Sequence, residues 1–263
     1  MSKQIAALEA QLGVRLLRRS TRKLSMTEEG ERLYAEARRI VEEVSEVESQ
    51  LKGGGQPQGT LRVACPPVFA RMKLLPHAAT FLSQYPQPGL EFSVHDRFVD
   101  LVEDGIDVAI RIGEVADSGL HTKRIGTARR ICVAAPRYLE AHGTPDSPAE
   151  LRVHHCVLYT LLATGATWPF EGMPVKVFGR VRGNSPEVVM SMALNGLGIA
   201  MAPAFLFTGA PASGQLREIL NSWPLPGLPI HAPYLARRHL PGRIRLFVDH
   251  LAHAFAADHE LRI

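Results

Sequence analysis

Cysteine is scarce in this sequence, and the few residues present lie far apart. Cys65, Cys132 and Cys156 form no CxxC pair, and their odd number rules out complete pairing. Disulfide-dense secreted domains and cysteine-based zinc modules need more cysteines at closer spacing. The chain also opens without a secretory signal peptide. We therefore expect a protein of a reducing compartment, the cytoplasm.

A long uninterrupted hydrophobic run is also missing, although one stretch resembles such a run. No charged residue lies between Glu187 and Arg217, a length that would suffice to cross a bilayer. That stretch contains several helix breakers: Gly196, Gly198, Pro203, Gly209 and Pro211. Because they would interrupt a spanning helix repeatedly, a helix, a glycine stop and a buried strand are the better interpretation.

Motifs that carry catalysis are absent as well. The sequence has no nucleophile elbow, phosphate-binding loop or HExxH pair. The run HHC at 154–156 has metal-capable groups, but neighbours on a strand point to opposite faces. His250 and His253 share a helix face, where an exposed surface is the simpler interpretation. We expect no enzymatic activity, no cofactor and no metal site.

Charge is present in both signs but unevenly distributed. The 263 residues carry a net charge of +4 and are 46% hydrophobic, which suits a globular chain of more than one domain. Residues 1–25 contain six basic residues and one acid, whereas residues 27–51 contain eight acids and three arginines. This split separates a basic N-terminal unit from an acidic helix.

The N-terminal unit combines a short helix with a basic hairpin. Ile5, Leu8 and Leu12 form one apolar stripe, and Gly13 ends the helix. Five basic residues follow within nine positions: Arg15, Arg18, Arg19, Arg22 and Lys23. A polar helix start beside a basic loop is typical of DNA recognition, with the helix in the major groove and the loop on phosphates. A solvated surface is the alternative for the basic run alone.

The acidic segment carries a regular hydrophobic seam. Its apolar residues alternate at spacings of four and three, a heptad pattern: Leu33, Ala37, Ile40, Val44, Val47 and Leu51. The strict alternation favours pairing with a partner helix over packing on the helix's own domain. Ser25 and Glu28 are spaced as a capping box. The glycine-rich residues 52–57 then predict a flexible joint.

The rest of the chain alternates short apolar runs with helical stretches. Runs such as "LRVAC", "RICVAA", "CVLYT" and "GIAMA" predict strands, and residues 67–84, 186–194 and the segment after Pro241 predict helices. This order predicts an α/β fold with right-handed crossovers. Ligands of such sheets bind at the carboxyl ends of strands.

The N-terminal residues resemble a known family. "SKQIAALEAQLGVRLLRRSTRKLSMTEEGERLYAEARRI" is similar to the winged helix-turn-helix and linker helix of LysR-type transcriptional regulators. The resemblance implies three parts: a partial DNA-binding domain at 1–26, a dimerising linker and hinge at 27–58, and an effector-binding domain at 59–263. The implied assembly is a homodimer or homotetramer on double-stranded operator DNA, without membrane contact.

The same resemblance assigns DNA-binding residues. Ser2 and Lys3 would face base edges or phosphates, and Arg19, Thr21 and Arg22 would hold the DNA backbone. In the family two further helices precede this point, and Met1 falls where valine is usual, a residue whose GTG codon can serve as a start. A truncated ligand-binding, dimerising protein without operator affinity is therefore the alternative to a DNA-binding regulator.

Segments such as "GTLRVACPPVFARMKLLP", "DRFVDLVEDGIDVAIRIG" and "NGLGIAMAP" extend the resemblance to the family's effector-binding domain. That domain has the two-lobed fold of type-2 periplasmic binding proteins. Two strands would cross between the lobes, near 127–133 and near 232–237. The implied effector residues come from both lobes: Pro67, Val68, Phe69, Arg111, Gly113, Asn184, Ser185 and Phe205.

The chemistry of these residues suggests a class of effector. Members of the LysR-type subgroup that this sequence resembles commonly carry serine where Val68 stands. This wall of the implied effector pocket is therefore more apolar here. With two helix starts, two phenylalanines and Arg111, we expect a small organic acid with an apolar or aromatic body. Arg111 has an alternative as an ion-pair partner of Asp107 or Glu114. Glu187 has an alternative in stabilising the first turn of its helix.

Overall fold

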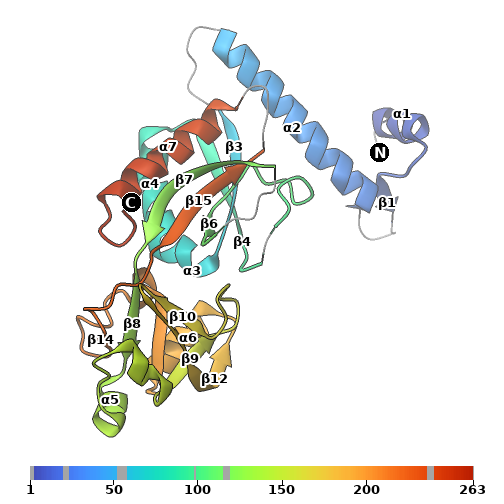
Figure 1. Ribbon diagram of the computed structural model, residues 1–263. Coiled ribbons are helices and arrows are strands. Elements are labelled where there is room, and N and C mark those ends of the chain that lie inside the picture. The colour runs from blue at the N-terminus through green and yellow to red at the C-terminus, as the bar shows by residue number, and fades with distance from the viewer. Residues whose placement is uncertain are drawn as a thin grey trace.

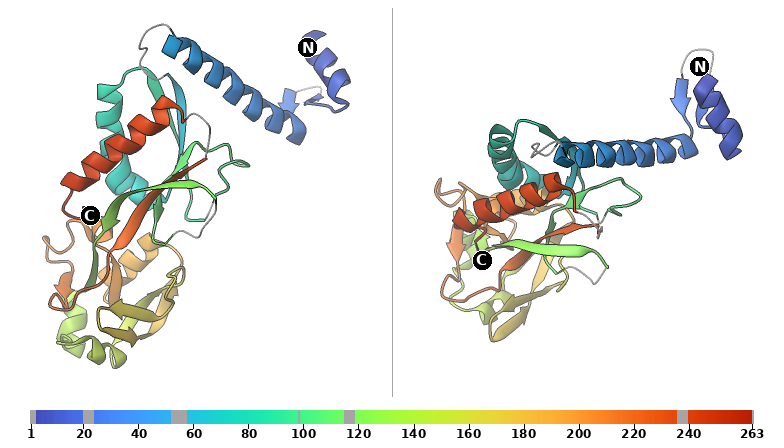
Figure 2. Two further views of the ribbon diagram at one scale, coloured as in Figure 1. Left: turned by 45° about the horizontal axis from the view of Figure 1, so that its top comes forward. Right: turned by 90° about the horizontal axis from the view of Figure 1, so that it is seen from above.

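The computed structural model describes residues 3–19, 24–51, 58–97, 99–114, 119–235 and 240–262. The molecule consists of an N-terminal arm and two α/β lobes, which lie one above the other in Figure 1. We call the lobe nearer the arm lobe I and the other lobe II. Both views in Figure 2 show α2 (Glu28–Leu51) leading away from the lobes, with the N-terminal unit at its far end.

The N-terminal unit has the predicted helix and hairpin. Helix α1 (Lys3–Leu12) ends at Gly13, whose positive φ of 72° suits glycine. Strands β1 (Leu17–Arg19) and β2 (Leu24–Met26) pair antiparallel. The Glu9 carboxylate accepts the backbone N–H groups of Leu16 at 2.7 Å and Leu17 at 3.1 Å, which ties the helix to the hairpin.

Helix α2 begins at a different cap from the predicted one. Ser25 lies in β2, paired with Arg18, so it cannot cap the helix. Thr27 does so instead: its hydroxyl oxygen accepts the N–H of Gly30 at 3.0 Å and donates to the carbonyl of Arg15 at 2.6 Å. The hairpin is thereby held against the start of α2.

Lobe I is built from the two ends of the effector-domain sequence. Its elements are β3 (Gly59–Cys65), α3 (Pro67–Phe69), the π-helical η1 (Ala70–Leu74), α4 (Leu75–Gln84), β4 (Pro88–Val94), β5 (Val108–Ala109), β6 (Arg111–Ile112), β7 (His121–Ala128), β15 (Leu228–Tyr234) and α7 (Gly242–Ala257). The sheet order is β4-β3-β5-β15-β6, with β7 on β15. In Figure 1, α4 and α7 lie side by side against this sheet.

Lobe II contains the middle of the chain. Its elements are β8 (Arg130–Ala134), α5 (Pro136–His142), η2 (Pro148–Arg152), β9 (His155–Tyr159), β10 (Thr167–Phe170), β11 (Met173–Lys176), β12 (Phe178–Gly183), α6 (Pro186–Leu194), β13 (Ile199–Pro203), η3 (Ala204–Phe207) and β14 (Arg217–Ile219). The sheet order is β12-β9-β13-β8-β14. The predicted mixed α/β fold is confirmed.

The uncharged stretch between Glu187 and Arg217 folds as predicted into a helix, a glycine stop and a buried strand. They are α6, Gly196 with a positive φ of 64°, and β13, four of whose five residues are buried. Across the described parts of the chain, no helix is long and apolar enough to span a membrane.

The chain crosses between the lobes twice. The first crossing lies at Arg129, between β7 and β8, within the predicted range 127–133. The second prediction, 232–237, is wrong where the structure describes it, because β15 already belongs to lobe I from Leu228 onward. The return lies between β14 and β15, at residues 220–227. The apolar run at 228–234 is the central strand β15, which is paired along its length within lobe I. The hydrophobic pattern of a sequence does not show which sheet such a strand joins.

Aromatic side chains join the two lobes. The rings of Phe69 in α3 and Phe205 in η3 make an edge-to-face contact, with centroids 5.4 Å apart. Phe69 also contacts Phe255 of α7 at 5.8 Å. Because Phe69 and Phe205 are only 1% and 5% exposed, this contact is part of the continuous hydrophobic core.

This contact can be measured with a double-mutant cycle. Phe69→Leu and Phe205→Leu should each lower the free energy of unfolding by about 1–3 kcal/mol. Their coupling should be about 0.5–1.5 kcal/mol in urea denaturation, since each removes one ring of the pair. The matched control is Phe81 with Phe247, centroids 5.1 Å apart within lobe I. Coupling in the control but none between Phe69 and Phe205 would contradict the contact between lobes.

Candidate functional site

Helix starts from both lobes face each other beside the hinge. In lobe I, α3 begins at Pro67 directly after β3. In lobe II, α6 begins at Pro186 directly after β12 and Asn184-Ser185. Both starts follow the carboxyl end of a strand with parallel neighbours, the position where α/β sheets bind ligands.

An ion pair spans the lobes at this point. The Arg71 guanidinium lies 3.6 Å from the Glu187 carboxylate, with Arg71 one turn beyond Pro67 and Glu187 in the first turn of α6. Their side chains are 63% and 60% exposed. Water and salt therefore screen the pair, which contributes little to stability. Either charge can exchange its partner for a ligand at small cost.

Two further titratable groups lie within electrostatic reach. Burial and then the negative charge of Glu187 raise the pKa of Asp96, which follows β4. Burial and then the charge of Asp96 raise the pKa of Tyr159 at the end of β9. A carboxyl with a raised pKa takes up a proton more readily and can then donate a hydrogen bond. We call Arg71, Asp96, Tyr159, Ser185 and Glu187 the interlobe site.

The start of α6 leaves hydrogen-bonding capacity at this site. Ser185 is the N-cap residue, but its side chain makes no capping hydrogen bond. The nine-residue helix directs its first N–H groups and the positive end of its dipole toward the site. An anion is stabilised there.

The apolar residues predicted for the site lie behind it. Val68, Phe69 and Phe205 are all buried in the core cluster, and Pro67 is half-buried at the start of α3. Of these side chains, Phe69 and Phe205 contact each other across the two lobes. Asn184 is exposed beside Ser185, where it can reach a ligand.

Arg111 and Gly113 have structural contacts within lobe I. The Arg111 guanidinium donates a 2.9 Å hydrogen bond to the carbonyl of Val99, and burial lowers its pKa. Gly113 adopts a positive φ of 104° and donates its N–H to Pro229 at 2.8 Å, ending β6 in a turn. The Asp107 carboxylate, one proposed partner of Arg111, accepts the backbone N–H of Arg62 at 3.0 Å.

Sequence reasoning missed Arg71, Asp96 and Tyr159. A usable signal was present: Asp96 and Tyr159 stand at or just beyond the ends of apolar runs predicted to be strands. Arg71 lies four residues after Pro67, on the same side of a predicted helix. The rule that ligands gather at strand ends would have selected Asp96 and Tyr159, and the helix side that Pro67 occupies would have selected Arg71.

The histidines considered for metal binding make structural hydrogen bonds. His154 Nδ1 lies 3.2 Å from the Tyr138 hydroxyl, which accepts the N–H of His155 at 2.9 Å. His250 and His253 contact backbone carbonyls of lobe I, at 3.0 and 2.8 Å. Among the described residues, no group of three or more His, Cys, Asp or Glu is placed to hold a metal ion.

The DNA-binding residues are described only in part. Lys3 is exposed at the start of α1, and the backbone of Arg19 lies in β1. Ser2, Thr21 and Arg22 lie outside the described residues. Helix α1 buries none of its residues, and Leu8 and Leu12 are 38% and 46% exposed.

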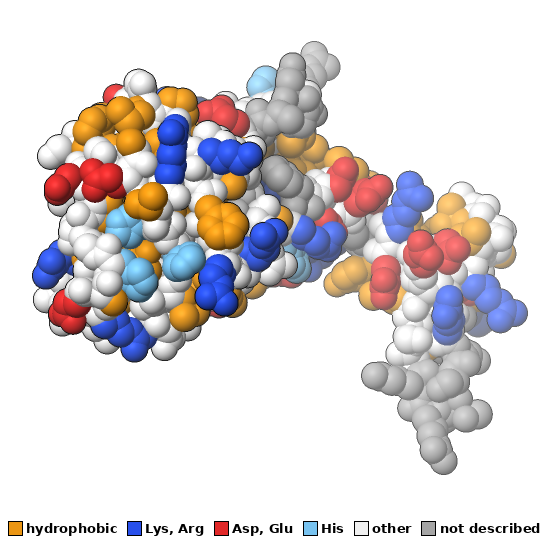
Figure 3. All heavy atoms as spheres, turned by 60° about the horizontal axis from the view of Figure 1, so that its bottom comes forward, with side chains coloured by type: hydrophobic (Ala, Val, Ile, Leu, Met, Phe, Trp, Pro, Cys, Tyr) orange, Lys and Arg blue, Asp and Glu red, His pale blue; other side chains and the backbone are white. Residues whose placement is uncertain are grey.

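The seam of α2 faces away from its own chain. Ile40 and Val44 are 61% and 53% exposed, Ala37 is exposed, and Leu33 is half-buried. The backbones of Val47 and Leu51 continue the helix, but their side chains lie outside the description. Figure 3 shows hydrophobic side chains among acidic ones along this arm.

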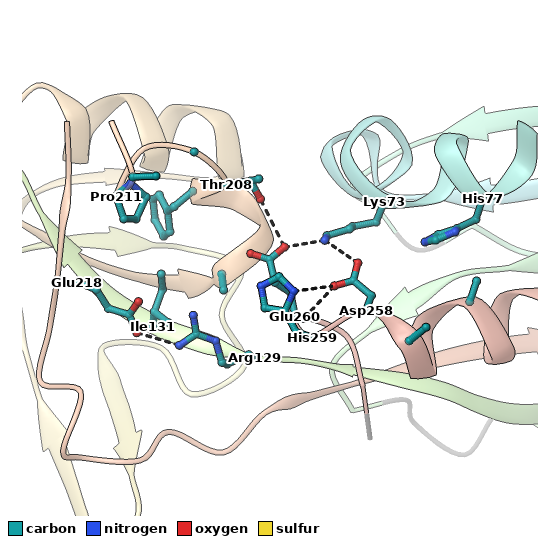
Figure 4. Close-up of a pocket in the computed structure, with 16 residues that line it drawn as sticks. Lys73, His77, Arg129, Ile131, Thr208, Pro211, Glu218, Asp258, His259 and Glu260 are labelled. Atoms are coloured by element: carbon teal, nitrogen blue, oxygen red, sulfur yellow. Dashed lines mark hydrogen bonds and ion pairs between the residues drawn. The ribbon is translucent and has the colours of Figure 1, made fainter. Parts of the chain in front are cut away.

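A cavity of about 640 Å³ lies elsewhere, at the rear of the hinge. Lys73, Arg129, Thr208, Glu218, Asp258 and Glu260 are among its lining residues (Figure 4). None of the predicted effector residues lines it.

Comparison with known proteins shows which family this architecture belongs to. The LysR substrate binding domain family matches residues 54–256, and the bacterial regulatory helix-turn-helix protein, lysR family, matches residues 1–31. The regulator PtxR of Pseudomonas aeruginosa is 35% identical over 256 residues, 95% of this chain and 82% of PtxR. The regulator CrgA of Neisseria meningitidis serogroup C is 34% identical over 95% of this chain and 86% of its own.

Solved structures of LysR-type regulators have the same architecture as this chain. The structure of CrgA from Neisseria meningitidis, 34% identical, superposes with a TM-score of 0.67 over 95% of this chain and 86% of CrgA. The full-length virulence activator AphB of Vibrio cholerae, 30% identical, superposes with a TM-score of 0.63 over 95% of this chain and 88% of AphB. The chain belongs to the LysR family of bacterial transcriptional regulators, a family of regulators and not of enzymes, and carries its effector-binding domain.

Proposed function

We propose that this regulator senses a small organic acid at the interlobe site and dimerises through the α2 seam to bind operator DNA. The observation that carries the effector class is the exposed Arg71–Glu187 pair beside the start of α6. A ligand carboxylate can take the place of Glu187 on Arg71 while it accepts hydrogen bonds from Ser185 and the first N–H groups of α6.

The surroundings favour an acid with an apolar body. Val68, Phe69 and Phe205 form part of the apolar core behind the site. Half-buried Tyr159 offers an aromatic ring and a hydroxyl, whose pKa is raised by burial and then by the charge of Asp96. Asp96 and Glu187 repel a second carboxylate unless one of them is protonated, so a monocarboxylate fits better than a dicarboxylate.

DNA binding is proposed for the N-terminal unit. Lys3 lies at the exposed start of α1, and the basic hairpin stands beside it. In this proposal Ser2 and Lys3 contact the groove, and Arg19, Thr21 and Arg22 contact phosphates. Residues 1–26 form this unit, 27–58 the linker and 59–263 the sensor.

A second candidate function is a ligand-binding dimer without operator affinity. It is favoured by the exposure of apolar side chains around α1: Leu8 at 38%, Leu12 at 46% and Leu24 at 61%. A recognition helix that buries none of its residues holds its side chains loosely. DNA binding measured on this chain separates the two candidates.

The effector proposal predicts stabilisation by monocarboxylates. Benzoate, phenylacetate and butyrate should be screened by thermal shift, because a ligand that binds the folded state raises its melting temperature. Ser185→Ala should weaken the best of them by about 1 kcal/mol, roughly one hydrogen bond. Ser191→Ala, at an exposed position on the same helix, is the control. If no monocarboxylate stabilises the protein, or both variants respond like wild type, the site is wrongly assigned.

Phosphate contact predicts a uniform effect on DNA affinity. Arg22→Ala should weaken binding of fluorescent duplexes of unrelated sequence by a similar factor, and should reduce the salt slope by about one. Arg152→Ala, an exposed arginine of η2, should change neither quantity. A selective loss for one duplex would contradict a backbone role. Wild-type chain without DNA affinity at low salt would favour the second candidate function.

The seam predicts a dimer that one charge disrupts. Ile40→Asp would bury a carboxylate between two α2 helices, at a cost of about several kcal/mol. Sedimentation velocity should then show dissociation or loss of the linker contact. Arg32→Asp places the same carboxylate at an exposed position on another side of α2, with a larger change in net charge, and should leave assembly intact. Equal sedimentation of Ile40→Asp and wild type would exclude the seam as the main contact.

A further inference from the structure

The segment after α7, residues 258–261, is hydrogen-bonded to the hinge at its rear, the side with the cavity of about 640 Å³. Its backbone accepts two hydrogen bonds from the end of β7: the N–H of Thr127 reaches Leu261 at 2.7 Å, and the N–H of Arg129 reaches Glu260 at 3.0 Å. Leu261 is fully buried. A Cβ at Gly126 would stand 2.7 Å from the Leu261 carbonyl, so glycine permits this close approach. Residues 258–261 are therefore packed onto the crossing strand.

Lys73 holds the same segment to lobe I. Its ammonium lies 2.7 Å from the Asp258 carboxylate and 2.6 Å from that of Glu260, as Figure 4 shows. These side chains are only 12%, 16% and 11% exposed. Burial opposes the charge of Lys73, but the hydrogen bonds to both carboxylates outweigh it and raise the pKa of Lys73. Charge-assisted bonds shielded from water resist displacement.

Arg129 connects this network to lobe II. Its carbonyl accepts the N–H of Ala204 in η3 at 2.7 Å, and its guanidinium lies 2.8 Å from the Glu218 carboxylate in β14. The N–H of Arg129 is held by Glu260, so this one residue at the crossing is fixed by both lobes. The Thr208 hydroxyl of lobe II donates mainly to Phe205, at 2.8 Å, and reaches Glu260 only at 3.5 Å.

The helix that carries Lys73 also carries Arg71. The two residues stand two positions apart on a helical segment, so their side chains point to different sides. Arg71 reaches Glu187 at the interlobe site, and Lys73 reaches the rear segment. A shift of this helix at the interlobe site therefore moves the group that holds the rear segment.

We propose that residues 258–261 are a hinge clamp that couples the α3–η1 helix to the hinge at Arg129, with Lys73 as the positioning residue. This inference builds on the proposed function, because it describes how binding at the interlobe site changes the lobe arrangement. The Arg71–Glu187 ion pair at the front is exposed and is easily broken. The network of Lys73, Asp258 and Glu260 at the rear is shielded from water and acts as the pivot. The cavity of about 640 Å³ beside it leaves room for the lobes to rotate.

Interlobe distances measured without ligand test the clamp. Spin labels at Glu103→Cys in lobe I and Glu171→Cys in lobe II occupy exposed positions. The native thiols do not compete for the label, because Cys65, Cys132 and Cys156 are buried and burial raises the pKa of Cys65 and of Cys156 to about 12. Double electron–electron resonance between the two labels then gives the distribution of distances between the lobes.

Lys73→Met should broaden or shift the distribution, and Lys73→Arg should restore it by restoring the ion pairs. The matched control is Lys123→Met, which breaks the exposed Lys123–Asp249 ion pair within lobe I and should leave the distribution as in the wild type. Glu260→Gln, which keeps the Asp258 pair, should have an intermediate effect and carries the test if Lys73→Met does not fold. A wild-type distribution in both Lys73→Met and Glu260→Gln would overturn the clamp.

The clamp and the effector proposal fail in different ways. The distances are recorded on unliganded protein, so a screen that finds no stabilising monocarboxylate overturns the effector class and leaves the clamp standing. An Arg71→Met variant that changes the distribution as much as Lys73→Met would place the pivot at the front, and would overturn the clamp while the effector site stands.

Discussion

The pairing of β7 with β15 is the constraint on which the two-lobed structure depends. Leu228 to Tyr234 pairs along its length with β7, with Leu228 opposite Ala128 at the hinge end. Both connections to lobe II leave from this one pair of strands, at Arg129 and before Leu228. The lobes can therefore rotate about a narrow hinge while each keeps its own sheet. In the proposed clamp, the contacts of Lys73 at the rear of the hinge set which arrangement of the lobes is populated.

Much of the fold follows from local sequence signals. The helix at 186–194, the helical stretch at 67–84 and the basic hairpin are as predicted, because caps, breakers and hydrophobic periodicity act over a few residues. The second crossing and the cap of α2 are not. A seven-residue apolar strand reads the same in either lobe, and Thr27 replaces Ser25 only because hairpin pairing engages Ser25.

The candidate site shows the same division. The sequence points to the two helix starts, and the structure brings them together through Arg71 and Glu187. The sequence does not predict that Val68, Phe69 and Phe205 pack in the core, because their burial depends on how the two lobes come together. Asp96 and Tyr159 lie at or just beyond the ends of strands of different lobes and Arg71 lies on a helix, so their proximity depends on how the two lobes are placed. The effector class, the DNA contacts and the dimer seam stay predictions.

The most direct test of the account is hydrogen–deuterium exchange with and without a monocarboxylate that raises the melting temperature. Binding at the interlobe site predicts slower exchange at the first turns of both α3 and α6, on opposite lobes, in the same experiment. Protection confined to one lobe, or centred on the cavity at the rear of the hinge, would contradict the assignment of ligand recognition to the interlobe site.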